Sequence, residues 1–141
     1  MRRLYVLVDT ALCRDPLAVA AAAARGGAGI VQLRAKALGA RAYRELFAAL
    51  MPAVRAHGAQ ACVNDHVAVA AVLGADAVHV GQDDLSVADV RALVGPRCAI
   101  GVSAHTPEQA RAAQDAGADY VGLGPMFATT TKPHEAQRGP E

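Results

Sequence analysis

The stretch GADAVHVG, residues 74–81, decides the fold, because the chain repeats it as GADYVGLG at residues 117–124. The copies lie 43 positions apart, and a weaker version, GAGIVQL at residues 27–33, begins 47 positions before the first. In each copy a glycine leads into a short apolar run, which is typical of a helix end followed by a buried strand. Each interval holds two strand–helix units of about 22 residues, a spacing that suits a (βα)8 barrel.

Short apolar runs alternate with longer, alanine-rich amphipathic runs around this repeat. Strands are predicted over Leu4–Val8, Gly29–Arg34, Gln60–Val63, Ala77–Gly81, Cys98–Val102 and Asp119–Leu123. Helices are predicted over Pro16–Arg25, Ala40–His57, Val67–Leu73, Val87–Val94 and Pro107–Ala116. Strands joined by crossover helices run parallel, and runs that are nearly all apolar suit strands covered on both faces.

This order predicts an α/β fold: a TIM-type (βα)8 barrel lacking about the last two βα units, with six parallel strands in one domain over residues 1–141. A complete, small doubly wound sheet is the alternative. Its usual glycine-rich first turn is absent, because Asp9-Thr10-Ala11-Leu12 follows the first strand. Asp76 and Asp119 begin their strands at the end opposite a barrel active site, so we assign them to turns.

The composition excludes several classes of protein. Hydrophobic residues make up 53% and charged residues 19% of the chain, which indicates a globular domain. The formal charge of +1 does not suggest a nucleic-acid or polybasic membrane surface. Without a membrane span or signal peptide, the chain is expected to be cytoplasmic. The three cysteines form no CxxC pair and are expected to be free thiols, and we assign no histidine a zinc or catalytic role.

The run Gln32-Leu33-Arg34-Ala35-Lys36 carries the strongest sign of a binding site. Side chains alternate along a strand, so Gln32 and Arg34 share one face, and Lys36 continues it. A guanidinium and an ammonium at the carboxyl end of a barrel strand suit a ligand diphosphate. A strand end that runs into solvent with ordinary surface charges is the alternative.

Acidic and hydroxyl side chains follow other predicted strands. Asn64-Asp65 follows the third strand and Gln82-Asp83-Asp84 the fourth, and carboxylates from adjacent loops suit Mg²⁺. Either loop alone is also compatible with a plain turn or helix cap. Ser103 comes directly after the fifth predicted strand, and the loop Thr129-Thr130-Thr131-Lys132 suits a phosphate, with a solvated linker as the alternative.

With these residues in view, the chain resembles the thiamine-phosphate synthase (thiamine-phosphate pyrophosphorylase) family from Leu4 to about Lys132. The matching motifs are LYVLVD (4–9), QLRAK (32–36), ND (64–65), HVGQDD (79–84), GVSAHT (101–106) and GLGP (122–125), followed by TTTK (129–132). The resemblance implies a barrel enzyme that joins a hydroxymethylpyrimidine diphosphate to a thiazole phosphate with Mg²⁺, releasing pyrophosphate. Both substrates are small phosphorylated molecules.

The resemblance also implies roles for individual residues. The QLRAK motif would hold the pyrimidine diphosphate together with Asn64, Ser103 and Lys132, and we expect the last two to act in catalysis. Asp65 and Asp84 would ligate Mg²⁺, and the threonine run Thr129, Thr130 and Thr131 would meet the thiazole phosphate. A non-catalytic protein that binds the pyrimidine diphosphate, and a thiazole tautomerase of the same fold, are the alternatives.

Members of the resembled family continue through two more strands, which complete the thiazole-phosphate site. The sequence is therefore expected to be truncated at its C-terminal end. A six-stranded remnant would leave two sheet edges open, which another chain could cover.

Overall fold

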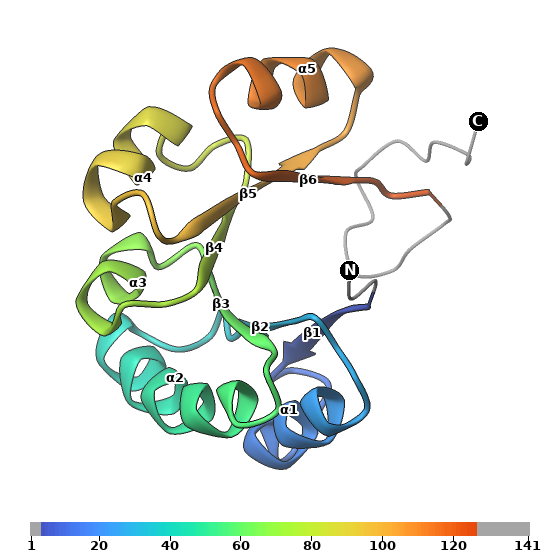
Figure 1. Ribbon diagram of the computed structural model, residues 1–141, viewed down its shortest axis with the longest axis vertical. Coiled ribbons are helices and arrows are strands. Elements are labelled where there is room, and N and C mark those ends of the chain that lie inside the picture. The colour runs from blue at the N-terminus through green and yellow to red at the C-terminus, as the bar shows by residue number, and fades with distance from the viewer. Residues whose placement is uncertain (1–3, 127–141) are drawn as a thin grey trace.

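Six parallel strands form one curved sheet in the computed structural model, which describes residues 4–126. The strands are β1 (Tyr5–Asp9), β2 (Ile30–Arg34), β3 (Gln60–Asn64), β4 (Ala77–Val80), β5 (Ala99–Ala104) and β6 (Tyr120–Leu123). They lie side by side in chain order, each hydrogen-bonded in parallel to the next. The sheet curves into an arc that is open on one side between β1 and β6 (Figure 1).

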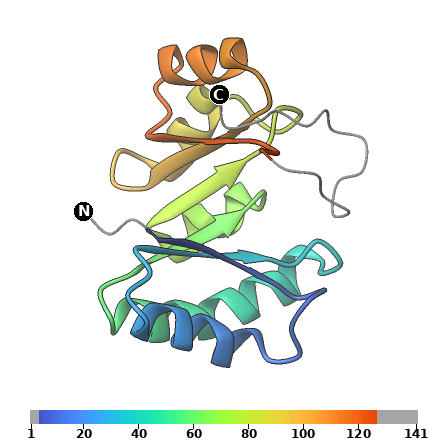
Figure 2. The ribbon, with the colours of Figure 1, turned by 90° about the vertical axis from the view of Figure 1, so that its right-hand side faces the viewer.

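Five helices cover the convex face of this arc (Figures 1 and 2). They are α1 (Pro16–Arg25), α2 (Ala40–Arg55), α3 (Val67–Leu73), α4 (Val87–Val94) and α5 (Pro107–Asp115). The core lies between helices and strands, where Leu33 and Ile100 of the sheet and Phe47 and Leu50 of α2 are fully buried. Side chains on the other face of each strand therefore point into the concave interior.

Local sequence sets where the helices begin. The side chains of Asp15, Ser86 and Thr106 each accept a backbone N–H from the first turn of the helix that follows, which satisfies a donor that has no partner inside the helix. Proline begins both α1 and α5, where its missing N–H carries no cost. At the end of α3, Gly74 adopts a left-handed conformation with φ of 61°, which favours a residue without Cβ.

The fold confirms the predicted barrel architecture and shows that the doubly wound alternative is wrong. A doubly wound sheet has helices on both faces and a reversal of strand order, whereas here the order is sequential and the helices share one face. All predicted elements are found, with ends that differ by up to two residues. The largest difference in a strand is β5, which continues to Ala104 and so includes Ser103.

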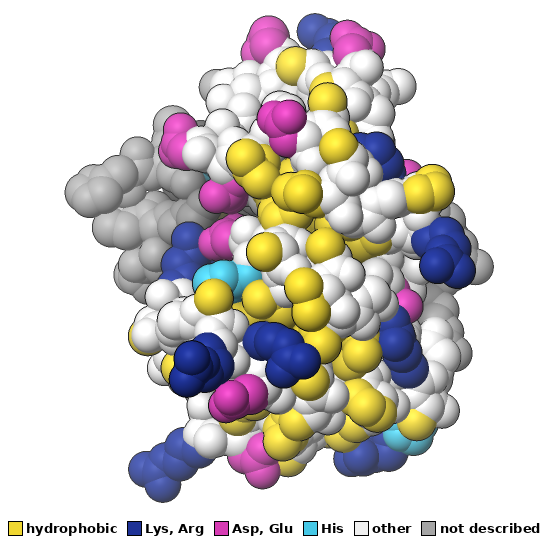
Figure 3. All heavy atoms as spheres, turned by 90° about the vertical axis from the view of Figure 1, so that its left-hand side faces the viewer, with side chains coloured by type: hydrophobic (Ala, Val, Ile, Leu, Met, Phe, Trp, Pro, Cys, Tyr) yellow, Lys and Arg dark blue, Asp and Glu magenta, His cyan; other side chains and the backbone are white. Residues whose placement is uncertain are grey.

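The helical face of the molecule carries apolar side chains between scattered charges (Figure 3). Val72 of α3 and Leu93 of α4 are both more than half exposed. Even so, no helix within residues 4–126 is long and apolar enough to cross a membrane.

Candidate active site

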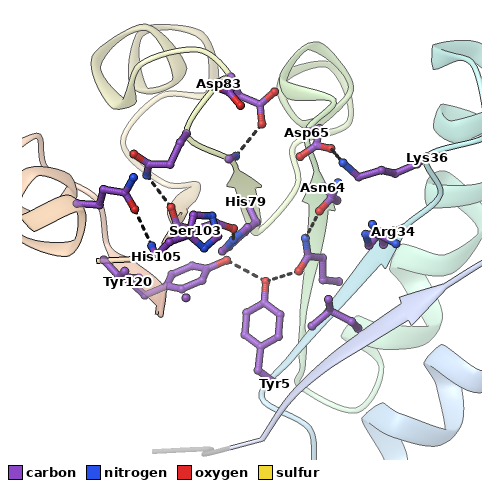
Figure 4. A pocket seen from close by; sticks show the side chains of 18 residues that line it. Tyr5, Arg34, Lys36, Asn64, Asp65, His79, Asp83, Ser103, His105 and Tyr120 are labelled. Carbon is purple, nitrogen blue, oxygen red and sulfur yellow. Dashed lines mark hydrogen bonds and ion pairs between the residues drawn. The ribbon is translucent and has the colours of Figure 1, made fainter. Parts of the chain in front are cut away.

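A cleft of about 860 Å³ opens on the concave side of the sheet, lined by residues of all six strands and of the loops that follow β2, β3, β4 and β5. Figure 4 shows these side chains converging from separate strands. The lining includes Tyr5, Gln32, Arg34, Lys36, Asn64, Asp65, His79, Gln82, Asp83, Asp84, Ser103, His105, Gln109, Tyr120 and Gly122. Charged groups from several crossovers therefore line one cavity.

Two cations of the cleft are held by carboxylates. Arg34 at the end of β2 forms an ion pair through Nη1 with Asp9 at the end of β1, its direct neighbour in the sheet register. Burial by itself raises the pKa of the Asp9 carboxyl, but the Ala11 N–H and the Arg34 guanidinium together hold that pKa below its usual value. Lys36 Nζ lies 3.5 Å from Asp65 Oδ2 in a more exposed pair. Both cations therefore line the cleft with their charged ends oriented by neighbouring carboxylates.

The deeper part of the cleft holds a pair of buried amides. Gln32 Nε2 donates to Asn64 Oδ1 at 2.6 Å, and the Tyr5 hydroxyl donates to Gln32 Oε1 at 3.0 Å. The backbone at Asn64 is fixed as well, because its N–H donates to the Tyr43 hydroxyl, which in turn donates to the Leu33 carbonyl. These bonds give the cleft a rigid polar floor.

Aromatic side chains form the remaining wall of the interior. The Tyr5 and Tyr120 hydroxyls lie 3.1 Å apart although their strands are the two edges of the sheet, and the His79 ring packs near both. Tyr120 lies directly over Gly101, where a Cβ would overlap its ring, so this close approach requires glycine. The Cys62 thiol is fully buried below, and burial raises its pKa to about 11. That thiol is therefore protonated at neutral pH and a poor nucleophile.

Ser103 is positioned by two neighbours. Its hydroxyl lies 2.9 Å from His79 Nε2, and its carbonyl accepts Gln82 Nε2 at 2.6 Å. Nearby, His105 Nδ1 contacts the Gly124 carbonyl at 2.7 Å, which ties the end of β5 to the segment after β6. The Ser103 hydroxyl therefore faces the cleft in a fixed setting that includes an imidazole.

Carboxylate oxygens at the mouth of the cleft fit the chemistry of a Mg²⁺ site. Asp65 follows β3 and has a positive φ of 62°, an uncommon conformation for a residue with a side chain. Asp84 follows β4 and accepts the Gly81 N–H through Oδ2 at 2.6 Å. Residues 4–126 contain no cluster of three or more histidine, cysteine or acidic side chains able to hold a metal. Mg²⁺ commonly takes only one or two carboxylates and completes its shell with water and substrate phosphate, so this donor set suits it.

The structure brings most of the predicted site residues together. Seven of their side chains line the cleft: Gln32, Arg34, Lys36, Asn64, Asp65, Asp84 and Ser103. Leu33 and Ala35 of the same motif are buried in the core on the helix side of the strand, so a ligand could meet only their backbone. Thr129, Thr130, Thr131 and Lys132 lie outside the described residues.

Several lining residues were missed from the sequence. His79 and His105 were given no role, Tyr5 and Tyr120 were not named as site residues, and Asp83 was noted in an acidic loop without being assigned to the metal, yet all five line the cleft. For two of them, the alternation of side chains between the two faces of a strand was a signal available in the sequence. It places His79 on the inward face of β4 and Tyr5 on that of β1, opposite the buried Val78 and Val8.

These features define a parallel α/β barrel-type protein with a cleft lined by charged and amide side chains at the carboxyl ends of its strands. A family model described as thiamine monophosphate synthase matches residues 4–141. The chain belongs to this family.

Individual relatives agree with that assignment. The chain is 48% identical over 131 residues to the thiamine-phosphate synthase of Solidesulfovibrio magneticus, covering 92% of this chain and 62% of that relative. It is 50% identical over 131 residues to that of Laribacter hongkongensis, covering 91% and 62%. The solved thiamine phosphate pyrophosphorylase of Pyrococcus furiosus superposes with a TM-score of 0.83 at 31% identity, covering 91% of this chain and 62% of that structure. The chain thus spans about 62% of the length of these relatives.

Proposed function

We propose that this chain carries the pyrimidine-diphosphate half of a thiamine-phosphate synthase site. The reaction joins 4-amino-2-methyl-5-hydroxymethylpyrimidine diphosphate to thiazole phosphate: the bond from the pyrimidine methylene carbon to the diphosphate oxygen breaks, and a bond to the thiazole nitrogen forms. Pyrophosphate leaves with the electron pair of the broken bond. One observation supports this most strongly, namely that Arg34, Lys36, Asp65 and Asp84 share one cleft with a buried amide pair.

The residues of the cleft divide between the two ends of that substrate. Arg34 and Lys36 bind the diphosphate, because their charge offsets the negative charge that grows on it as the bond breaks. Gln32 and Asn64 meet the polar edge of the pyrimidine ring. Ser103, held by His79, donates a hydrogen bond to a diphosphate oxygen. Such a reaction needs no protein nucleophile, which agrees with the protonated, buried Cys62.

Asp65 and Asp84 are the residues proposed to hold Mg²⁺. The ion would supply positive charge that stabilises the departing pyrophosphate. Residues Thr129, Thr131 and Lys132 remain proposed contacts of the phosphates.

An assay with both substrates and Mg²⁺ tests this proposal. The purified chain should release pyrophosphate and form thiamine phosphate, and Arg34→Met should lower the rate by at least about tenfold, the loss of one charge-assisted hydrogen bond to the leaving group. The same assay on the chain extended to the length of its relatives is the control. Absence of product from both proteins would refute the synthase function.

A second candidate function is binding of the pyrimidine diphosphate without turnover. It is favoured by the fact that the described cleft contains the residues assigned to the diphosphate and to the metal. Calorimetry with Mg²⁺ and the pyrimidine diphosphate separates the two functions. Micromolar binding, lost in Arg34→Met and unaccompanied by product in the assay, would establish the binding function instead.

A further inference from the structure

Two linked hydrogen bonds, one buried and one partly buried, cross three adjacent strands in the wall of the cleft. They run from the Tyr5 hydroxyl on β1 to Gln32 on β2 at 3.0 Å, and from Gln32 to Asn64 on β3 at 2.6 Å (Figure 4). Gln32 is 2% exposed and Asn64 9% exposed, so water cannot readily substitute for these bonds. We call the three side chains the amide relay.

The direction of the amide relay decides what Asn64 offers to a ligand. An amide has a donor end and an acceptor end, so fixing one end of Gln32 fixes the other. With the Tyr5 O–H donating to Gln32 Oε1, Gln32 Nε2 faces Asn64 and must donate to its Oδ1. The remaining polar end of Asn64 is then the N–H₂ group. If Gln32 were flipped, Asn64 would donate to it and would turn its carbonyl oxygen to the ligand instead.

Tyr5 is the residue that can fix the Gln32 amide in one of these two orientations. Burial raises the pKa of its hydroxyl, so the proton stays in place at neutral pH. That single proton has two possible acceptors besides the Tyr120 oxygen: Gln32 Oε1 at 3.0 Å and Cys62 Sγ at 3.5 Å. The amide oxygen is nearer and the stronger acceptor, while Tyr120 can donate to the Tyr5 oxygen.

We propose that Tyr5 is a positioning residue that sets the direction of the amide relay, so that Asn64 offers N–H donors to an acceptor nitrogen of a heteroaromatic ring. This inference rests on the proposed function, because the ring is that of the pyrimidine diphosphate. It assigns ring selectivity to a residue that acts through Gln32, while the diphosphate is bound by the separate cations at the mouth of the cleft.

Two ligands separate ring recognition from phosphate recognition. Calorimetry in Mg²⁺ compares the pyrimidine diphosphate with inorganic pyrophosphate, which lacks the ring. Tyr5→Phe keeps the aromatic ring and removes only the hydroxyl. It should weaken pyrimidine diphosphate binding about tenfold, the loss expected for one buried hydrogen bond that orients others, and pyrophosphate binding less than twofold.

Tyr120→Phe is the matched control, because it removes a hydroxyl from the same aromatic group but leaves the Tyr5–Gln32 bond in place. The loss of ring selectivity in Tyr5→Phe should exceed that in Tyr120→Phe at least fivefold. Equal losses in the two variants, or an equal weakening of both ligands by Tyr5→Phe, would overturn the role of Tyr5. Either pattern would indicate a general packing effect.

A third variant tests the direction of the relay itself. Asn64→Asp can still accept from Gln32, but it replaces the N–H₂ group with an oxygen. It should lose ring selectivity at least as strongly as Tyr5→Phe, and the double variant should lose no more than Asn64→Asp alone, since both changes act on one contact. Additive losses would overturn the relay. If the unaltered chain binds the pyrimidine diphosphate no more tightly than pyrophosphate, ring recognition and the proposed function fail together, whereas a ring preference that survives in Tyr5→Phe refutes only the relay.

Discussion

The two ends of the barrel both carry ion pairs between acidic and basic side chains, but these pairs are bonded to the rest of the molecule in different ways. At the amino end, Asp76 and Asp119 occupy equivalent positions of the internal repeat, and each accepts a backbone N–H of the preceding strand, from Ala61 and Ile100 respectively. Each also pairs with an arginine of a helix, Arg55 or Arg91. These arginines donate in turn to backbone carbonyls, so both partners are tied to the main chain.

At the carboxyl end the cations of the ion pairs make fewer hydrogen bonds to the main chain. Within the described part of the chain, the hydrogen bonds and ion pairs of Arg34 and Lys36 are with the carboxylates of Asp9 and Asp65, and none goes to a backbone carbonyl. One N–H group of the Arg34 guanidinium makes the bond to Asp9, and the proposed function assigns its other donors to a ligand phosphate. The comparison indicates that charge at the amino end stabilises the fold, whereas under the proposed function the charge at the carboxyl end serves binding.

The largest expected effect is a loss of stability when an aspartate of the amino end is removed. Asp76→Ala removes the acceptor of the Ala61 N–H and the two hydrogen bonds, each at 3.0 Å, that Asp76 accepts from the Arg55 guanidinium. Because Ala61 is fully buried, water cannot replace that acceptor. The free energy of unfolding should fall by about 2–3 kcal/mol, measured by urea denaturation followed by circular dichroism. Asp83→Ala, at an exposed position at the carboxyl end, should change it by less than about 0.5 kcal/mol. Similar losses at both ends would contradict the contrast.

The next largest effect is a difference between substituting the arginine at the carboxyl end, Arg34, and substituting one at the amino end, Arg55. Arg34→Met should weaken pyrophosphate binding about 30-fold, equivalent to about 2 kcal/mol, and should lower stability by less than about 1 kcal/mol. Arg55→Met should leave pyrophosphate binding nearly unchanged and should lower stability by more than Arg34→Met does. The reason is that Arg55 is anchored to Asp76 and the Gly74 carbonyl, far from the ligand. Calorimetry and urea denaturation of both variants give the comparison. A loss of binding in Arg55→Met, with the fold intact, would show that the amino end also serves the ligand.

The sequence predicted this architecture well, because the repeat and the alternation of apolar runs reflect packing that every βα unit shares. The ends of elements were predicted less accurately, by up to two residues. Ser103 interrupts the apolar run of β5, and the strand was predicted to stop at Val102. A strand that lines a polar cleft carries polar side chains at its end, so hydrophobicity alone underestimates its length.

Prediction of the site was limited by register and curvature. The convergence of Arg34 with the acidic loops follows from parallel strands ending at one edge. The partner of Arg34 does not, because Asp9 faces it only through the register of β1 with β2. The contact of Tyr5 with Tyr120 depends on how far the sheet curves, which no local pattern encodes.

A smaller effect at the amino end depends on pH. Burial alone raises the pKa of the Asp119 carboxyl, but the Ile100 N–H and Arg91 hold that pKa below its usual value. A lowered folded-state pKa adds stability above the unfolded pKa of about 3.8, and this stability is lost as the pH falls through the folded value. Asp119→Asn should therefore be less stable than the unaltered chain at pH 7, by less than about 1 kcal/mol since the pair is partly exposed, and the difference should shrink at pH 3. Urea denaturation at both pH values measures this, and a difference independent of pH would exclude the charge as its source.

The smallest expected effect concerns Lys36, whose pair with Asp65 should be exchangeable. Lys36 Nζ lies 3.5 Å from Asp65 Oδ2, and its side chain is 58% exposed, so a divalent cation that binds Asp65 must first displace a weakly held ammonium. An exposed pair is worth less than about 1 kcal/mol, so Lys36→Met should raise Mn²⁺ affinity about two- to fourfold when no phosphate is present. Electron paramagnetic resonance of free Mn²⁺ measures this without catalysis.

Arg34→Met is the matched control for that measurement, because it removes a positive charge from the same cleft but from a different carboxylate, Asp9. Its gain in Mn²⁺ affinity should be clearly smaller than that of Lys36→Met, and Asp65→Asn should abolish the gain from Lys36→Met. Equal gains would mean that the overall field of the cleft governs the metal, and no gain would mean that Lys36 does not compete for Asp65. A specific gain would show that the cations at this end exchange their partners on binding, which the doubly anchored arginines of the amino end cannot do.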